Sequence, residues 1–146
     1  MSAGYSGKPL AQKLGIREGY SLALLNAPAG YSRLLGELPD GVTVIRGSRG
    51  ELDFIQLFAT DKRSLEEKLP GLLERLKQGG MLWVSWPKAS SKSQTDLTDV
   101  VVREVGLNNG LVDVKVCAVD EKWSALKFVR RPEDKDGNWR PTKKKP

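Results

Sequence analysis

VDVKVCAVDEKWSALKFVR, residues 112–130, contains two runs of apolar and β-branched residues separated by Asp120-Glu121-Lys122. Both runs have the composition of β-strands. Three residues are too few to join two strands in any way other than as an antiparallel hairpin. The C-terminal part of the chain therefore predicts paired strands over residues 112–119 and 123–130.

Upstream of this hairpin, predicted strands alternate with predicted helices. The strands are expected at residues 20–25, 42–45, 52–59 and 81–86, and the helices at 8–14, 29–38, 64–78 and 96–106. The alternation predicts an α/β fold with three layers: a Rossmann-like, mostly parallel sheet of about six strands, closed by the C-terminal antiparallel hairpin. The strand order expected is second, first, third, fourth and then the hairpin. Strands 52–59 and 81–86 are apolar nearly throughout, which is typical of central strands buried on both faces.

The helix at residues 64–78 carries three local signals. Ser64 and Glu67 fit a capping box at its start. Pro70 predicts a kink or a split within it. The pair Gly79-Gly80 is expected to end it.

The composition excludes several classes of site. The 146 residues suit one domain and include no histidine and one cysteine, Cys117. Ser-His-Asp and Cys-His triads, imidazole metal ligands, internal disulfides and thiolate zinc clusters are therefore excluded, and no catalytic residue or metal ligand is assigned.

No apolar run approaches the ~18 residues of a membrane span, and no signal peptide is visible, so a cytoplasmic protein without a membrane contact is expected.

Charge divides the chain into a body and a tail. We expect a flexible N-terminus at residues 1–7, a single Rossmann-like domain at 8–130 and a basic, disordered tail at 131–146. The net charge is +6, and residues 130–146 hold seven basic and three acidic side chains, which leaves +2 for the body. Such a tail aids solubility or makes weak contact with a polyanion. An aromatic side chain among basic ones, such as Trp139, stacks on a base, docks on a partner or folds back on the body of the protein. The candidate partner-binding residues are Trp139, Arg140, Lys143, Lys144 and Lys145.

Several segments resemble the S-adenosylmethionine-dependent methyltransferase fold in a shortened form. They are residues 14–24, where Leu-Gly and Glu-Gly lead into the first strand, residues 76–84, where Gly-Gly leads into the fourth, and Gly106-Leu107 with Trp123 around the hairpin. The resemblance covers residues 10–130 and implies a cofactor held by a glycine-rich first loop and by an acid after the second strand. This chain departs from both features. Its first loop, residues 25–30, keeps only Gly30 and contains Pro28, which lacks an N–H, and Arg46 follows the second strand.

A closer resemblance is to an uncharacterised bacterial family, the domain of unknown function 3052 family. It is carried by residues 79–88, by the helix from Asp96, by Gly106-Leu107 and by residues 123–129. The resemblance implies the same shortened Rossmann-like fold and brings no assigned activity or cofactor.

The topology also predicts where a ligand would bind. In open α/β sheets, ligands lie beyond the carboxyl ends of the strands, where the strand order reverses. That place is the crevice between the first and third strands, with the end of the fourth strand beside it. The candidate ligand-binding residues are Asn26, Pro28, Gly30, Thr60, Asp61, Lys62, Ser85, Lys88 and Lys92.

Four of these residues also have an ordinary structural interpretation. Lys88 and Lys92, among several serines ahead of a helix, suit a phosphate or a carboxylate, or they form a plain surface loop. Asp61 either faces a ligand or begins a helix, and Asn26 either holds a ligand or caps a turn.

Three functions remain open on these observations. The first is a degenerate methyltransferase-like domain that binds an unknown small molecule or a partner without catalysis. The second is an enzyme that uses S-adenosylmethionine or another nucleotide through a rebuilt first loop, with Arg46 on a phosphate. The third is a nucleic-acid-associated protein that uses the basic tail. Whether the protein is an enzyme, and which cofactor it takes, is not decided by the sequence.

Overall fold

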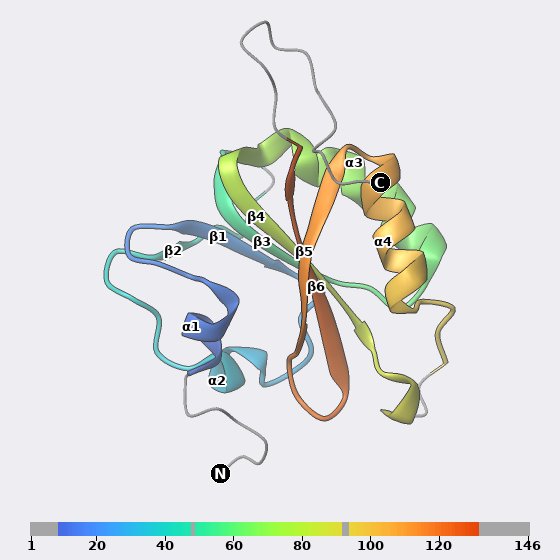
Figure 1. The fold of residues 1–146 in the computed structure, drawn as a ribbon. Helices are drawn as coiled ribbons and strands as arrows, with labels where there is room; N and C mark the ends of the chain where they lie inside the picture. Colours follow the sequence, from blue (N-terminus) through green and yellow to red (C-terminus); the bar gives the residue numbers. More distant parts are fainter. Residues whose placement is uncertain (1–8, 48, 92–93, 132–146) are drawn as a thin grey trace, which may run out of the picture.

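The six strands of the computed structural model form one sheet in the order β2-β1-β3-β4-β6-β5 (Figure 1). The structure describes residues 9–47, 49–91 and 94–131. The predicted fold is confirmed: the sheet is Rossmann-like, and of its six strands β6 alone runs in the direction opposite to the others. Lys92, the N-terminal segment 1–7 and the candidate tail residues Trp139, Arg140, Lys143, Lys144 and Lys145 lie outside the described residues.

The helices and strands follow one another much as the sequence pattern predicts. In chain order they are α1 (Leu10–Leu14), β1 (Ser21–Leu25), α2 (Tyr31–Leu35), β2 (Thr43–Val44), β3 (Leu52–Phe58), α3 (Lys62–Arg75), β4 (Leu76–Pro87), the 3-10 turn Ala89–Ser91, α4 (Asp99–Asn108), β5 (Leu111–Ala118) and β6 (Trp123–Arg130). No helix among the described residues is long and apolar enough to cross a membrane.

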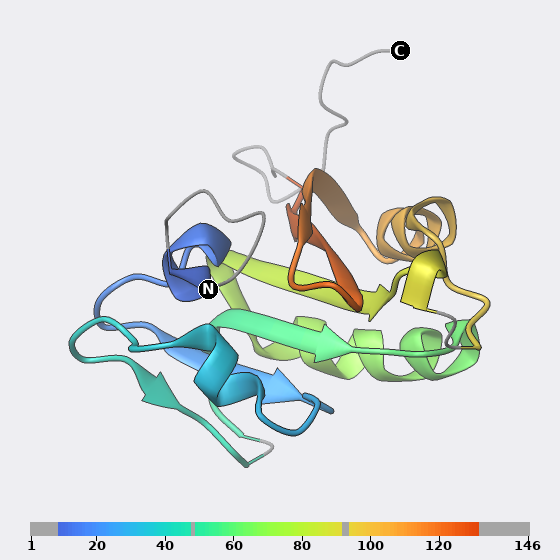
Figure 2. The same cartoon turned by 90° about the horizontal axis from the view of Figure 1, so that it is seen from below.

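The helices cover the two faces of the sheet unequally (Figure 2). Helices α1 and α2 pack on one face, and α3 and α4 pack on the other, so the core divides into two clusters. Successive side chains of β3 alternate between them: Phe54 and Phe58 belong to the α1 and α2 cluster, Ile55 and Leu57 to the α3 and α4 cluster. This explains why β3 and β4 are apolar nearly throughout.

Helix α3 begins and ends earlier than predicted. Its N-cap is Asp61, whose carboxylate accepts a hydrogen bond from the Ser64 N–H at 2.9 Å, so the predicted capping box at Ser64 is wrong. Pro70 lies inside one continuous helix, because it is exposed and the buried Leu69 and Leu72 hold the helix on the sheet. The helix ends at Arg75.

Gly79-Gly80 belongs to a bulge in β4 and does not end the helix. Leu52 of β3 pairs with Leu76, but Phe54 pairs with Met81, so four residues of β4 lie opposite Asp53 alone. Gly79 has a left-handed φ of 82°. A Cβ on Gly80 would lie 2.9 Å from Leu76 Cδ1 and 3.0 Å from the Asp53 carbonyl oxygen. Both positions therefore require glycine for the bulge to form.

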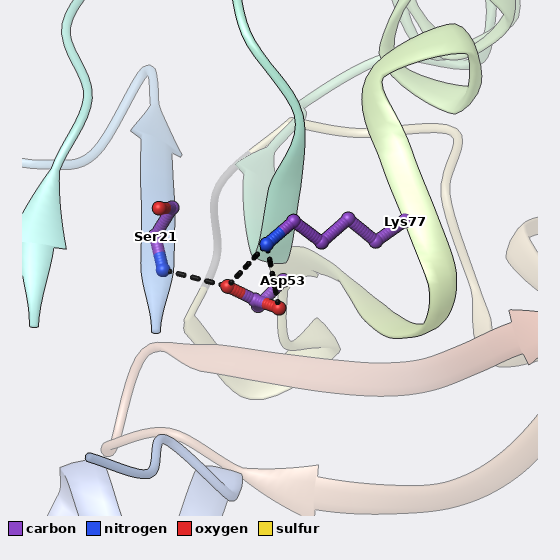
Figure 3. Close-up of polar contacts among 3 residues, drawn as sticks. All are labelled: Ser21, Asp53 and Lys77. Atoms are coloured by element: carbon purple, nitrogen blue, oxygen red, sulfur yellow. Dashed lines mark hydrogen bonds and ion pairs between the residues drawn. The ribbon is translucent and has the colours of Figure 1, made fainter. Parts of the chain in front are cut away.

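Asp53 joins the starts of three strands (Figure 3). Its Oδ2 accepts a hydrogen bond from the Ser21 N–H of β1 at 2.8 Å. Its Oδ1 lies 3.4 Å from Lys77 Nζ in the bulge of β4. This single carboxylate therefore supports both the register of β1 and the bulge.

Replacing Asp53 with alanine is expected to lower the free energy of unfolding by about 1–3 kcal/mol, because the half-buried Ser21 N–H loses its partner. Urea denaturation measures the change. Glu66→Ala, on the exposed side of α3, serves as the control and should change stability by less than about 0.5 kcal/mol. Equal stabilities of the two variants would contradict the role given to Asp53.

Candidate ligand pocket at the ends of β1 and β2

The chain turns sharply where it leaves β1. Asn26 adopts a left-handed conformation with φ of 59°, which asparagine tolerates better than most residues. Gly30, with φ of 82°, is the N-cap of α2, and the Pro28 carbonyl accepts a hydrogen bond from the Tyr31 N–H at 3.1 Å. The predicted first loop is therefore a compact turn that leads directly into α2.

A pocket of about 480 Å³ lies beyond the carboxyl ends of β1 and β2. That volume falls in the range of small-molecule sites. Its lining comes from β1 and the turn after it, from α2, from the end of β2 and from the last residue of α3. The lining residues are Ala23, Leu24, Leu25, Asn26, Ala27, Ser32, Leu35, Gly36, Leu38, Val44, Ile45, Arg46, Gly47 and Arg75.

The polar groups of this pocket favour an anion. Arg75 donates to the carbonyl oxygens of Gly50 at 3.0 Å and Arg49 at 2.7 Å, so its guanidinium is fixed in place. Arg46 is exposed, and within the described part of the chain it has no hydrogen-bond or ion-pair partner. The described lining has two guanidinium groups and no carboxylate, above an apolar floor that includes Leu24 and Val44. Such a surface suits a ligand with an apolar body and a phosphate or carboxylate.

Of the predicted ligand-binding residues that the structure describes, Asn26 lines this pocket and the others lie away from it. Two of them join the start of α3 to the loop before α4: the Thr60 carbonyl accepts from Thr95 Oγ1 at 2.7 Å, and the Lys62 N–H donates to Asp96 Oδ1 at 2.8 Å. Asp61 caps α3 itself. Pro28 and Gly30 shape the turn into α2. The Lys88 N–H donates to the Lys122 carbonyl at 2.8 Å and fixes the end of β4 to the hairpin.

A series of buried hydrogen bonds links α2, β3 and β4 through Tyr31, Gln56 and Ser85. Tyr31 Oη donates to Gln56 Oε1 at 2.7 Å, and Gln56 Nε2 donates to Ser85 Oγ at 3.0 Å. All three side chains are buried, so the predicted ligand residue Ser85 lies in the interior. Gln56 was not predicted from the sequence, although its place as the one polar residue within the apolar run 54–59 was the available signal. The ring of Phe58 lies edge-on to Tyr31 and Trp123, at centroid distances of 4.8 and 5.0 Å.

Tyr31 makes the free energy of unfolding depend on pH in the alkaline range. Burial raises the pKa of Tyr31 well above its usual value, and the weaker opposing effect is the hydrogen bond to Gln56. The neutral phenol therefore stabilises the fold fully below about pH 10, and this contribution is lost as pH rises above that value, where the unfolded chain ionises. We expect the difference in unfolding free energy between the wild type and Tyr31→Phe to shift against the wild type by about 1.4 kcal/mol per pH unit above pH 10. A difference that stays constant from about pH 8 to 11 would contradict this expectation.

No protein-family model matches the chain, and no curated protein matches it in sequence. Solved structures do match. The ribosomal protein L11 methylase of Lactobacillus delbrueckii subsp. bulgaricus is 12% identical over 84% of this chain and 75% of its own, with a TM-score of 0.56. A SAM-dependent methyltransferase from Aquifex aeolicus is 16% identical over 80% and 85% of the two chains, with a TM-score of 0.52. The fibrillarin of Aeropyrum pernix, solved with natively bound S-adenosyl-L-methionine, is 11% identical over 82% and 73%, with a TM-score of 0.55.

The fold is that of the S-adenosylmethionine-dependent methyltransferases. Identities this low establish the methyltransferase fold alone. The resemblance stated above implies an acid after the second strand that takes the ribose hydroxyls of the cofactor. Arg46 stands there, two residues beyond β2, and none of the described residues that line the pocket is an acid. A guanidinium donates hydrogen bonds and accepts none, so this lining does not fit the ribose in the way that the methyltransferase fold implies.

Proposed function

We propose that this protein is a ligand-binding module of the methyltransferase fold that takes a nucleotide, or a similar phosphate-bearing small molecule, in the pocket at the ends of β1 and β2. The proposal rests on one observation: Arg46 is exposed at the pocket rim, and no described residue pairs with its guanidinium. The apolar floor suits a base, and Asn26 and Ser32 offer polar groups beside it. In this proposal the module performs no methyl transfer.

The test compares two adenosine-containing probes, ADP and S-adenosylhomocysteine, by calorimetric titration of the full chain. ADP is expected to bind more tightly, because only ADP offers phosphates to Arg46. Arg46→Glu is expected to weaken ADP binding about 10- to 100-fold, which is the effect of losing a charge-assisted hydrogen bond of about 1.5–3 kcal/mol. Arg33→Glu, an exposed change on α2 outside the pocket lining, is the matched control and should retain the affinity.

Two results would overturn the proposal. Tighter binding of S-adenosylhomocysteine, unaffected by Arg46→Glu, would favour the alternative of an S-adenosylmethionine-dependent enzyme with a rebuilt first loop. The absence of binding by either probe would remove the nucleotide as the ligand. A thermal shift gives an independent readout, since a ligand at 100 times its dissociation constant stabilises the fold by about 2.7 kcal/mol.

The proposal includes membership in the domain of unknown function 3052 family. It is supported by the segments that carry the resemblance: residues 79–88 form most of β4, and residues 123–129 lie in β6. In the structure these two strands are antiparallel neighbours, and β6 lies between β4 and the edge strand β5.

A further inference from the structure

Four basic side chains from three parts of the chain gather beside the C-terminal hairpin. Lys13 belongs to α1, Arg17 follows it, Lys115 lies on β5 and Lys127 on β6. We call this set the hairpin patch. It lies apart from the ligand pocket, and none of its residues lines that pocket.

Strand register and hydrogen bonds bring the hairpin patch together. Lys115 and Lys127 are direct cross-strand partners on neighbouring antiparallel strands. Lys127 is also the partner of Trp83, whose Nε1 donates to the Leu14 carbonyl of α1 at 2.9 Å, so Lys127 lies on the α1 side of the sheet. Lys13 Nζ donates to the Ala118 carbonyl at 3.3 Å, and this hydrogen bond joins α1 to β5. The α1 and hairpin segments lie near each other in both views (Figures 1 and 2).

The electrostatics of the hairpin patch are unbalanced. Like charges directly opposite each other in a sheet are destabilising. Burial lowers the pKa of Lys127, and the positive charges of Lys115 and Arg17 lower it further. The ion pairs found among the described residues are Arg63 with Glu67, Lys77 with Asp53 and Arg103 with Asp113, and none includes a residue of the patch.

A purely structural explanation accounts for only part of this patch. A lysine on an edge strand discourages pairing with another chain, which explains Lys115 on β5. It does not explain Lys127, which lies on the interior strand β6 and is half-buried. None of the described acids forms an ion pair with these four cations, which indicates an external polyanion.

We propose that the hairpin patch binds the phosphate backbone of a single-stranded nucleic acid. Its cations lie on two adjacent strands and the helix beside them, which suits a series of phosphates. Membrane insertion is not favoured, because the large exposed apolar side chains of the described residues are only Val100, Val114 and Val116. Val116 pairs with Leu126, which belongs to the α3 and α4 cluster, so Val116 lies on the face of the sheet opposite the patch.

The test is fluorescence anisotropy of the full chain with a labelled 15-nucleotide oligouridine over a series of salt concentrations. The variant Lys115→Gln/Lys127→Gln is expected to bind at least ten-fold more weakly and to reduce the slope of log K against log salt by about 1.4, since each phosphate contact contributes about 0.7 on single strands. Removing the cross-strand repulsion should leave the melting temperature unchanged or higher, so loss of binding is not loss of fold. Arg63→Gln/Lys68→Gln on α3 removes the same charge from the opposite face and should retain the affinity.

Three results would overturn this inference. The first is an affinity unaffected by Lys115→Gln/Lys127→Gln, which would assign the binding to the tail. The second is equal weakening by the α3 control, which would show only a dependence on net charge. The third is no binding to oligouridine, with or without binding to vesicles that contain phosphatidylserine. All three are distinct from the ADP titration, because the patch and the pocket share no residue.

Discussion

Gly106→Val is expected to lower the free energy of unfolding by about 3 kcal/mol, because α4 touches β6 at this glycine. A Cβ on Gly106 would lie 2.2 Å from Phe128 Cε1 and 2.4 Å from Cζ. Phe128 is fully buried, so its ring has no free space into which it can turn. Overpacking of this kind costs about 1–3 kcal/mol or more, and valine adds two further methyl groups to the clash.

The matched control for this prediction is Gly71→Val in α3, where an added Cβ would meet nothing within 4 Å. Both glycines lie in helices, so the difference in helix propensity is the same and favours valine slightly. Urea denaturation should therefore leave Gly71→Val within about 0.5 kcal/mol of the wild type. Equal behaviour of the two variants would show that α4 can move away from β6. The close contact matters for the hairpin patch, because α4 supports β6 from the face opposite Lys127.

The sequence predicts the fold well because the decisive signals are local. A three-residue link permits only a hairpin, and the apolar runs of β3 and β4 identify central strands. Local signals fail where tertiary contacts decide. Asp61, rather than Ser64, caps α3 because the backbone at Asp61 is extended and places its carboxylate on the Ser64 N–H. The Gly79-Gly80 pair looks the same in the sequence whether it ends a helix or lies in a bulge. The pairing of β3 with β4 shows which of these two structures forms.

The position of the pocket was harder to predict than the fold. The rule of strand reversal points to the ends of β1 and β3, but there the segments after β3 and β4 bind each other through the Thr60–Thr95 and Lys62–Asp96 hydrogen bonds. The open space lies one strand farther out, because β2 has only two residues and the described residues between it and β3, 45–47 and 49–51, form no helix. The hairpin patch depends on the register of Lys115 with Lys127 across a bulge in β5, which no periodicity in the sequence reveals.

Gln56→Leu is expected to lower the free energy of unfolding by about 2–5 kcal/mol. The leucine leaves two buried hydroxyl groups, Tyr31 Oη and Ser85 Oγ, without their partner, and each unsatisfied group costs about 1–3 kcal/mol. Urea denaturation of the full chain measures the loss. Gln78→Leu, an exposed change in the β4 bulge, is the matched control and should stay within about 0.5 kcal/mol of the wild type.

The triple variant Tyr31→Phe/Gln56→Leu/Ser85→Ala is expected to recover most of that stability, since removing all the partners of a buried hydrogen-bond chain is nearly neutral. If the triple variant is as unstable as Gln56→Leu, the loss reflects packing and not hydrogen bonding. Recovery would mean that an apolar core supports this fold as well as the polar chain does. The hydrogen-bonded series of Tyr31, Gln56 and Ser85 would then matter for its position. Tyr31 begins α2 and so joins this series to the sheet edge that carries the pocket. The ADP titration of the triple variant measures whether the hydrogen-bonded series holds the pocket in shape. Ser32 and Leu35 of α2 line the pocket, and Tyr31 anchors that helix.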